Sequence, residues 1–330
     1  MGLNEMFSAA LDWAIRWRMN GLSSSGQRFS KDPALVKDVY EYFKKGITAG
    51  LGGWEGARLT ALEEGVPWPR RLFFWEGYTF GLCAQHACLG RAGNPFQHFP
   101  APGFRFMFWT GLGFWNGASK PMPVISLNPA LWTDVPEFEE EYPLILGGSS
   151  FSVIALTAAV NKSRLEDIAG VRNAADVDGI YLGAGRSLWF LYTRNYAKLA
   201  EVLDAHADHA KPMARGLGVA ITLTQLGTPE QVFRDLAALP STYWPHLLAG
   251  SLMGFTCLLM DDPRAAEPLS RFPAPLDALI AETKSNIASY GGPGWTKRFE
   301  ELGERHVALW DGLKPPAATT AQTHEPVAAK

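Results

Sequence analysis

Two short stretches of this chain match each other: EGYTFG at residues 76–81 and DGIYLG at residues 178–183. Two further matches follow in the same order: GLG at 111–113 with GLG at 216–218, and LILG at 144–147 with LLAG at 247–250. The second copies lie 102, 105 and 103 residues after the first, so both order and spacing are nearly kept. Because this period is too long for one solenoid unit, the pattern predicts an internal duplication into two pseudo-symmetric halves.

The matching stretches lie in apolar segments that favour buried helices. Residues 71–88 are apolar on most sides and contain no proline, and residues 104–117 form a second, aromatic-rich segment. The window 188–210 has helical propensity and a helical period. We therefore expect an all-α fold whose buried helices are rich in glycine and aromatic residues. Alternating β-branched residues at 124–125 and 219–222 would also permit short strands.

Glycine and proline positions give the expected organisation of the chain. A helix at 31–45 starts with Asp32 before Pro33, an N-cap followed by proline at the first helical position. Five prolines between residues 120 and 143 mark a connection. The expected units are N-terminal helices at 1–45, a first helical half at 46–165, a second half at 166–265, C-terminal helices at 266–312, and a disordered tail rich in proline, alanine and threonine at 313–330.

Composition and charge exclude several classes of function. The 330-residue chain is 47% hydrophobic with a formal net charge of −3, and no run of lysine or arginine marks a nucleic-acid interface. A membrane span needs roughly 20 consecutive apolar residues, and the best candidates, 144–160 and 247–260, are shorter. The sequence does not exclude peripheral contact with a membrane surface. The chain starts without the features of a secretory signal, and three cysteines (Cys83, Cys88 and Cys257) indicate free thiols, so we expect a cytoplasmic protein.

Aromatic side chains are dense in the predicted buried helices, where leucine would usually supply the volume. Such rings either fill the core or line a pocket for a flat or extended apolar molecule. Ring faces also stabilise positive charge, so a carbocation would be tolerated there. The residues that we expect to contact such a substrate are Trp75, Tyr78, Phe108, Trp109, Trp115, Tyr181 and Trp189.

Four charged residues stand out because they interrupt the apolar segments. Glu76 and Asp178 occupy matching places in the two halves, and Asp176 and Arg186 lie near Asp178 in the sequence. A buried carboxyl group without a partner has a raised pKa, which suits a general acid near neutral pH. The structural alternatives are a helix N-cap at Asp178, or a salt bridge from Asp178 or Glu76 to Arg186. Asp176 and Asp178 could also bind a metal, but no third ligand lies nearby in the sequence.

Other motifs are weak or missing. Among the histidines, His86 in an apolar helix is the best functional candidate, whereas His206 and His209 lie in a polar stretch typical of a solvated helix face. The chain has no dinucleotide-binding, P-loop or nucleophile-elbow glycine motif. Asp261 and Asp262 lack the further acid of a D-D-x-x-D diphosphate-binding motif. We therefore expect no cofactor, with magnesium needed only if the substrate is a diphosphate.

The run DGIYLGAGRSLWF at residues 178–190 resembles the UnbL-type family, a bacterial family of unknown function associated with enediyne polyketide gene clusters. The segment 74–77 (FWEG) is similar to that family's aromatic-Glu-Gly element, and the similarity spans about residues 40–260. The resemblance implies a role in bacterial secondary metabolism, near polyketide or polyene assembly. It supplies no catalytic residues, and the N-terminal part departs from the family, which leaves room for another apolar product such as a terpenoid.

These observations together predict a cofactor-independent cyclase or isomerase that acts on an isoprenoid or polyene chain by acid-initiated carbocation chemistry. Asp178 would be the general acid, tuned by Arg186 and Asp176, with Glu76 as its counterpart or as the base. The alternative is a non-catalytic binding protein that shields a polyene intermediate or passes it to a biosynthetic partner enzyme. A structural subunit of a biosynthetic complex is a third hypothesis.

Overall fold

The computed structural model describes residues 29–89, 94–101, 103–119, 137–157, 162–168, 171–270 and 276–286, together with residues 135, 160 and 301. Throughout these residues the secondary structure is helical, without a β-strand, so the expected all-α fold is confirmed. None of these helices is long and apolar enough to cross a membrane. The helix expected before residue 29, the candidate strand at 124–125 and the tail at 313–330 lie outside the described residues.

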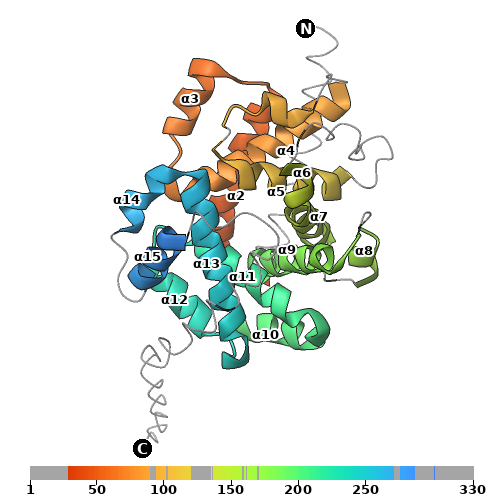
Figure 1. Cartoon of the computed structure of the whole chain (residues 1–330), viewed down its shortest axis with the longest axis vertical. Helices are drawn as coiled ribbons and strands as arrows, with labels where there is room; N and C mark the ends of the chain where they lie inside the picture. The colour runs from red at the N-terminus through yellow and green to blue at the C-terminus, as the bar shows by residue number, and fades with distance from the viewer. Residues whose placement is uncertain are drawn as a thin grey trace, which may run out of the picture.

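The helices are labelled in Figure 1, where α3 lies near the top of the molecule and α10 near the bottom. The α-helices are α2 (Pro33–Leu51), α3 (Gly56–Glu64), α4 (Arg71–Leu89), α5 (Arg105–Ser119), α6 (Glu137–Glu140), α7 (Tyr142–Thr157), α8 (Lys162–Glu166), α9 (Ala174–Tyr192), α10 (Tyr196–Ala205), α11 (Ala210–Thr224), α12 (Pro229–Ala237), α13 (Trp244–Asp261), α14 (Ala266–Leu269) and α15 (Leu276–Asn286). The 3₁₀ helices are η1 (Trp68–Arg70), η2 (Pro95–His98), η4 (Ala207–His209), η5 (Ser241–Tyr243) and η6 (Pro263–Ala265).

The core consists of long helices that pack in the order of the sequence. Helices α5, α7, α9, α11 and α13 each pack against the next, and α13 also contacts α5, which closes the series. Helix α2 packs on α4, and α4 packs on α5. In Figure 1, α9 and α11 cross the middle of the molecule, with α2 and α4 above them and α10 below. Any site in the core is therefore bordered by several helices.

The two aromatic-rich segments form buried helices, α4 and α5, as the sequence predicts. Helix α2 begins at Pro33, and the Asp32 side chain caps it by accepting a hydrogen bond from the backbone N–H of Leu35 at 3.1 Å. The helix expected at 31–45 extends further than predicted, because α2 continues through Gly46 and Gly50 to Leu51. These glycines face α4, where a side chain would not fit.

Two further expectations about secondary structure are wrong. Residues 219–222 lie in α11 and not in a strand, because they are buried in a helix that packs between α9 and α13. The window 188–210 is not one helix, since α9 ends at Tyr192 and α10 begins at Tyr196. Between them Arg194 has a φ of 59°, in the left-handed region, and so cannot continue a right-handed helix.

Close contacts between helix backbones depend on glycine. At Gly183 in α9, an added Cβ atom would lie 1.9 Å from the carbonyl oxygen of Gly147 in α7. At Gly113 in α5, an added Cβ atom would lie 2.0 Å from the carbonyl oxygen of Ile145, also in α7. These distances are far shorter than van der Waals contact, so a side chain at either position would force the helices apart.

We expect Gly183→Ala to lower the free energy of unfolding by about 3 kcal/mol, since overpacking a core commonly costs ~1–3 kcal/mol and here a backbone must move. Urea unfolding followed by circular dichroism measures the loss. Gly65→Ala is the matched control, because Gly65 is exposed and its added Cβ atom would lie 3.4 Å from the nearest carbonyl oxygen. The control should change stability by less than about 0.5 kcal/mol. Equal losses in both variants would contradict the close backbone contact.

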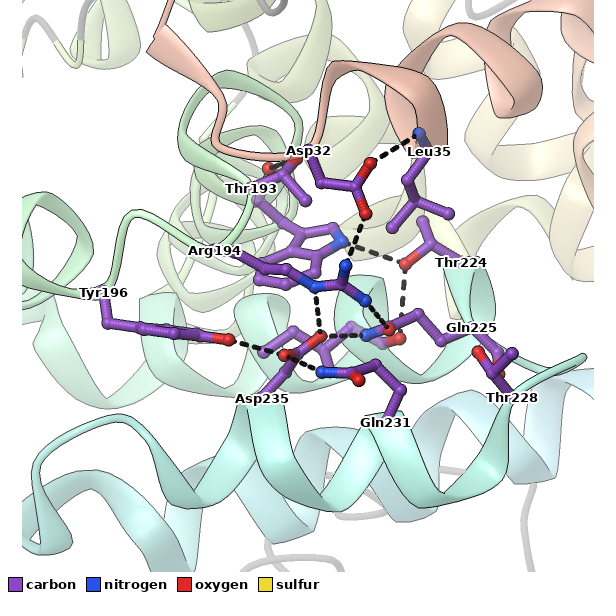
Figure 2. Close-up of polar contacts among 12 residues, drawn as sticks. Asp32, Leu35, Thr193, Arg194, Tyr196, Thr224, Gln225, Thr228, Gln231 and Asp235 are labelled. Carbon is purple, nitrogen blue, oxygen red and sulfur yellow. Dashed lines mark hydrogen bonds and ion pairs between the residues drawn. The ribbon is translucent and has the colours of Figure 1, made fainter. Parts of the chain in front are cut away.

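A polar network around Arg194 joins residues at α2, α9, α10, α11 and α12 (Figure 2). The guanidinium donates hydrogen bonds to Asp32 (2.5 Å), Gln225 (3.0 Å) and Asp235 (3.4 Å). The fully buried Asp235 carboxylate also accepts hydrogen bonds from Gln225 and Tyr196, at 2.5 Å each. The network thereby holds the start of α2 and the ends of α9 and α11 against α12, and it offsets the unfavourable backbone conformation of Arg194.

Replacing Arg194 by glycine and by alanine separates the backbone strain from the polar contacts. Both variants lose the guanidinium, but only alanine keeps a Cβ atom in the left-handed region. We expect Arg194→Gly to be more stable than Arg194→Ala by about 1 kcal/mol, and both to be less stable than the wild type. Urea unfolding of the three proteins under one set of conditions tests this. Equal stability of the two variants would show that the left-handed conformation carries no strain.

Candidate functional site

A buried ion pair lies between α4 and α9. The Arg186 guanidinium donates a hydrogen bond from Nη2 to Oε1 of Glu76 at 3.0 Å, and the two side chains are only 8% and 7% exposed. Two of the four predicted catalytic residues are therefore brought together, in the salt bridge that the sequence left as an alternative. Because two charges lose their hydration here, the pair is costly to bury and stable only with both members present.

Aromatic rings lie beside the ion pair. The Arg186 guanidinium lies 5.4 Å from the centre of the Phe151 ring, within cation–π range. Phe151 contacts Phe190 edge-on at 5.3 Å, and Phe190 contacts Tyr40 at 6.1 Å. Burial raises the pKa of the Tyr40 phenol, and the negative charge of Glu76 raises it further. The ion pair is thus set among rings from α2, α7 and α9.

Within the buried part of α9, from Ile180 to Leu191, three side chains keep slightly more accessible surface than their neighbours. Leu182, Arg186 and Phe190 keep 8%, 6% and 6% of their accessible surface, whereas Leu188 and Trp189 keep 0% and 1%. The first three residues recur every four positions, so they share one face of the helix. This face therefore has more accessible surface than its neighbours, although it lies deep in the core.

Helix α13 borders the same region through Cys257. Burial raises the pKa of the Cys257 thiol, and the charges of Asp261 and Glu141 raise it further, whereas the charge of Arg186 lowers it. Cys257 keeps 9% of its accessible surface, more than the other buried apolar residues of α13. The ion pair thus lies between α4 and α9, and the charge of Arg186 acts on a buried thiol of α13.

Asp261 is a second buried carboxyl group, which the sequence suggested only as part of an incomplete motif. Its oxygens accept hydrogen bonds from the backbone N–H groups of Phe106 and Met107, both at 3.1 Å, in the first turn of α5. Burial raises the pKa of Asp261 well above its ordinary value, although these two donors oppose the rise. Glu76 lies beside the same helix, because its carbonyl oxygen approaches Gly111. Gly111 lies four residues beyond Met107, or about 6 Å along the axis.

The structure corrects the environment predicted for Asp178. Its side chain is 50% exposed and accepts a hydrogen bond from Arg215 at 3.1 Å. Arg186 lies two turns further along α9 and pairs with Glu76, so it does not tune Asp178. The N-cap of α9 is Asn173 and not Asp178. Asp178 therefore lacks the burial on which its proposed role as an acid depended.

Asp176 also has a different neighbourhood from the one predicted. It is 1% exposed, and its Oδ2 accepts hydrogen bonds from the backbone N–H (2.7 Å) and from Nε (3.3 Å) of Arg172. Arg172 also donates a hydrogen bond to Glu139 at 2.5 Å and lies over the Tyr142 ring. Asp176 thus fixes the segment before α9 instead of facing Asp178. Its Oδ1 is buried without a hydrogen-bond partner.

The seven aromatic residues predicted to contact a substrate are all buried, but they do not form one site. Four of them belong to one network of ring contacts through Phe99: Trp75, Tyr78, Phe108 and Trp109. The others have separate neighbours: Trp115 packs on Phe80, Tyr181 stacks on His209, and the Trp189 indole donates a hydrogen bond to Thr224. The rings beside Arg186 were not among the seven. The four-residue spacing of Phe190 from Arg186 is the signal that could have identified one of them.

The described histidines are spread over several elements, and two of them, His86 and His98, are neighbours. The ring of His86 lies 5.0 Å from that of His98, whereas His209 stacks on Tyr181 at 3.7 Å. Burial lowers the pKa of His209, and the positive charge of Lys162 lowers it further. In the part of the chain that the structure describes, no three histidine, cysteine, aspartate or glutamate side chains lie together as a metal site would require.

A double-mutant cycle tests the coupling of Glu76 and Arg186. We expect Arg186→Met to lower the free energy of unfolding by about 3–5 kcal/mol, because it leaves a buried carboxylate without a counter-charge. The double variant Glu76→Gln with Arg186→Met should be more stable than Arg186→Met alone, since no charge then remains buried. Urea unfolding of the four proteins gives the coupling energy. Additive losses would contradict a coupled buried pair.

Comparisons of the chain with models of known protein families, with characterised proteins and with solved structures give no match. The function is therefore argued from the chemistry of the residues around Glu76 and Arg186.

Proposed function

We propose that this chain binds an extended apolar molecule, an isoprenoid or a polyene, along the α9 face beside Glu76 and Arg186, and isomerises or cyclises it by proton transfer. The observation that carries the proposal is the buried ion pair of Glu76 and Arg186, which lies beside aromatic rings. It lies on the face of α9 where Leu182, Arg186 and Phe190 keep some accessible surface. Apolar walls suit such a chain, and ring faces would stabilise positive charge that develops on it.

The two buried carboxyl groups suit opposite roles in this reaction. Asp261, whose pKa is raised by burial, would donate a proton to one carbon of a double bond, and the neighbouring carbon would become a cation. Glu76, held by the Arg186 guanidinium, would then take a proton from a carbon next to the cation, and a new double bond would form. At the end of the cycle Glu76 would release its proton to solvent, and Asp261 would take one up from solvent. Both residues border α5, Asp261 with its carboxylate at the first turn and Glu76 with its backbone at Gly111, which supports this division.

We also propose that the chain is duplicated, with α4, α5 and α7 corresponding to α9, α11 and α13. The sequence matches then place Asp178 where the first half has Glu76, and Arg215 where it has Thr110. Asp178 pairs with Arg215 within its own half, whereas Glu76 pairs with Arg186 of the other half. This difference supports Glu76 as the specialised carboxylate. The resemblance to the UnbL-type family supports a place in bacterial secondary metabolism, in the cytoplasm.

The reaction is tested by incubating the purified protein with farnesyl and geranylgeranyl diphosphates and with linear polyenes, with and without magnesium, and identifying products by mass spectrometry. We expect an isomerised or cyclised product whose rate of formation falls at least about 100-fold in Glu76→Gln and in Asp261→Asn. Asp277→Asn, an exposed change of the same charge in α15, is the matched control and should keep the wild-type rate.

Unchanged rates in Glu76→Gln would overturn the assignment of the base, and a loss confined to Asp178→Asn would return the acid role to Asp178. A ligand that quenches tryptophan fluorescence but is recovered unchanged would favour the second candidate, a binding protein that shields a polyene for a partner enzyme. One observation favours that candidate: Arg186 already neutralises the charge of Glu76, and a neutralised pair can line a binding site without taking part in a reaction.

A further inference from the structure

One face of α9 runs from the protein surface to the aromatic core. Asp178, Leu182, Arg186 and Phe190 recur every four residues and so lie along one stripe of the helix. The Asp178 side chain is 50% exposed, whereas the other three residues are buried. Phe190 lies twelve positions after Asp178, which corresponds to about 18 Å along the helix axis. The stripe is polar where it is exposed and ends among phenylalanine and tyrosine rings.

The exposed end of the stripe carries two cationic side chains. Arg215 donates a hydrogen bond to Asp178, and its side chain is only 3% exposed, so packing fixes the position of the guanidinium. The charge of Asp178 raises the pKa of His209 and that of Lys162 lowers it, so both charges act on the same imidazole. Lys162 is exposed. The carboxylate of Asp178 is therefore the movable member of the pair, and the Arg215 guanidinium is the fixed one.

We infer that the substrate is an amphiphile whose anionic head group binds Arg215 and Lys162 in place of Asp178, while its apolar tail follows α9 past Leu182 to Phe190. This inference rests on the proposed function, because it takes the same face of α9 as the binding surface. A guanidinium binds carboxylate or phosphate oxygens in a bidentate manner, and an ammonium group adds a second positive charge. Asp178 competes with the head group for Arg215, so it limits affinity for anions.

Binding is measured by quenching of tryptophan fluorescence of the full chain, in EDTA so that no metal ion bridges Asp178 and the ligand. The probes are geranylgeranyl diphosphate and geranylgeraniol, which share a tail and differ in the head. The wild type should bind the diphosphate at least about tenfold more tightly than the alcohol. Asp178→Asn should tighten binding of the diphosphate several-fold and leave that of the alcohol unchanged, and Asp277→Asn should change neither.

Two cationic variants complete the test. Lys162→Ala, an exposed change that leaves the core intact, should weaken diphosphate binding several-fold, and Arg215→Met should remove the preference for the diphosphate. Equal affinity of the wild type for both probes, or weaker diphosphate binding by Asp178→Asn, would overturn the inference. A preference for the diphosphate without any product would leave this inference standing and overturn the proposed reaction. A product formed without any preference for the anionic head group would overturn this inference and leave the proposed reaction standing.

Discussion

Where α9 meets α7, the carbonyl oxygen of Gly147 occupies the space that a side chain at Gly183 would need. The same relation holds where α9 meets α11, because the carbonyl oxygen of Met213 lies against Gly185. Parts of two sides of α9 are thereby committed to backbone contact, although Trp189 still reaches Thr224 of α11. A further side of the helix faces α4. This is the side that carries Arg186 and Phe190. The position of the ion pair thus follows from where glycine allows the helices to touch.

The two ion pairs of α9 differ in their electrostatic cost. Asp178 is half exposed, so its interaction with Arg215 is weakened by water and needs little compensation. Glu76 and Arg186 are both buried, and their attraction must outweigh the loss of hydration of two charges. Apolar residues of similar volume would commonly serve stability as well or better. A buried pair of this kind is more readily explained by chemistry than by stability.

Local signals predicted much of the fold, whereas the pairing of distant residues could not be predicted. The apolar segments without proline became α4 and α5, and Asp32 before Pro33 became the start of α2, because both features act within a few residues. Gly46 and Gly50 appeared to break a helix, since the sequence alone did not reveal that α4 would pack against them. In the same way the sequence matches suggested equivalent positions for Glu76 and Asp178, whereas Glu76 is buried and Asp178 is half exposed.

The candidate site was predicted only in part, because it is formed by residues that lie far apart in the sequence. Glu76 and Arg186 stood out as charges in apolar segments, and both belong to the site. Their pairing joins residues 110 positions apart, which no local pattern specifies. Asp178 was favoured because it resembles Glu76 in sequence, but its burial depends on which side of α9 faces solvent. Asp261 was overlooked, because its partners are backbone N–H groups of α5, which have no signature in the sequence.

The closure of the helix series by α13 also affects the order in which the chain assembles. The N–H groups at the start of α5 receive the carboxylate of Asp261, which is synthesised 155 residues after Phe106. Contacts between such distant residues form late, since a long loop must close before they stabilise anything. Until α13 leaves the ribosome, the first turn of α5 has only water as its partner, and the faces of α5 and α11 that α13 covers remain exposed. Within the described residues α13 thus completes the core, and a chaperone would find its binding surface in the half-made protein on those two faces.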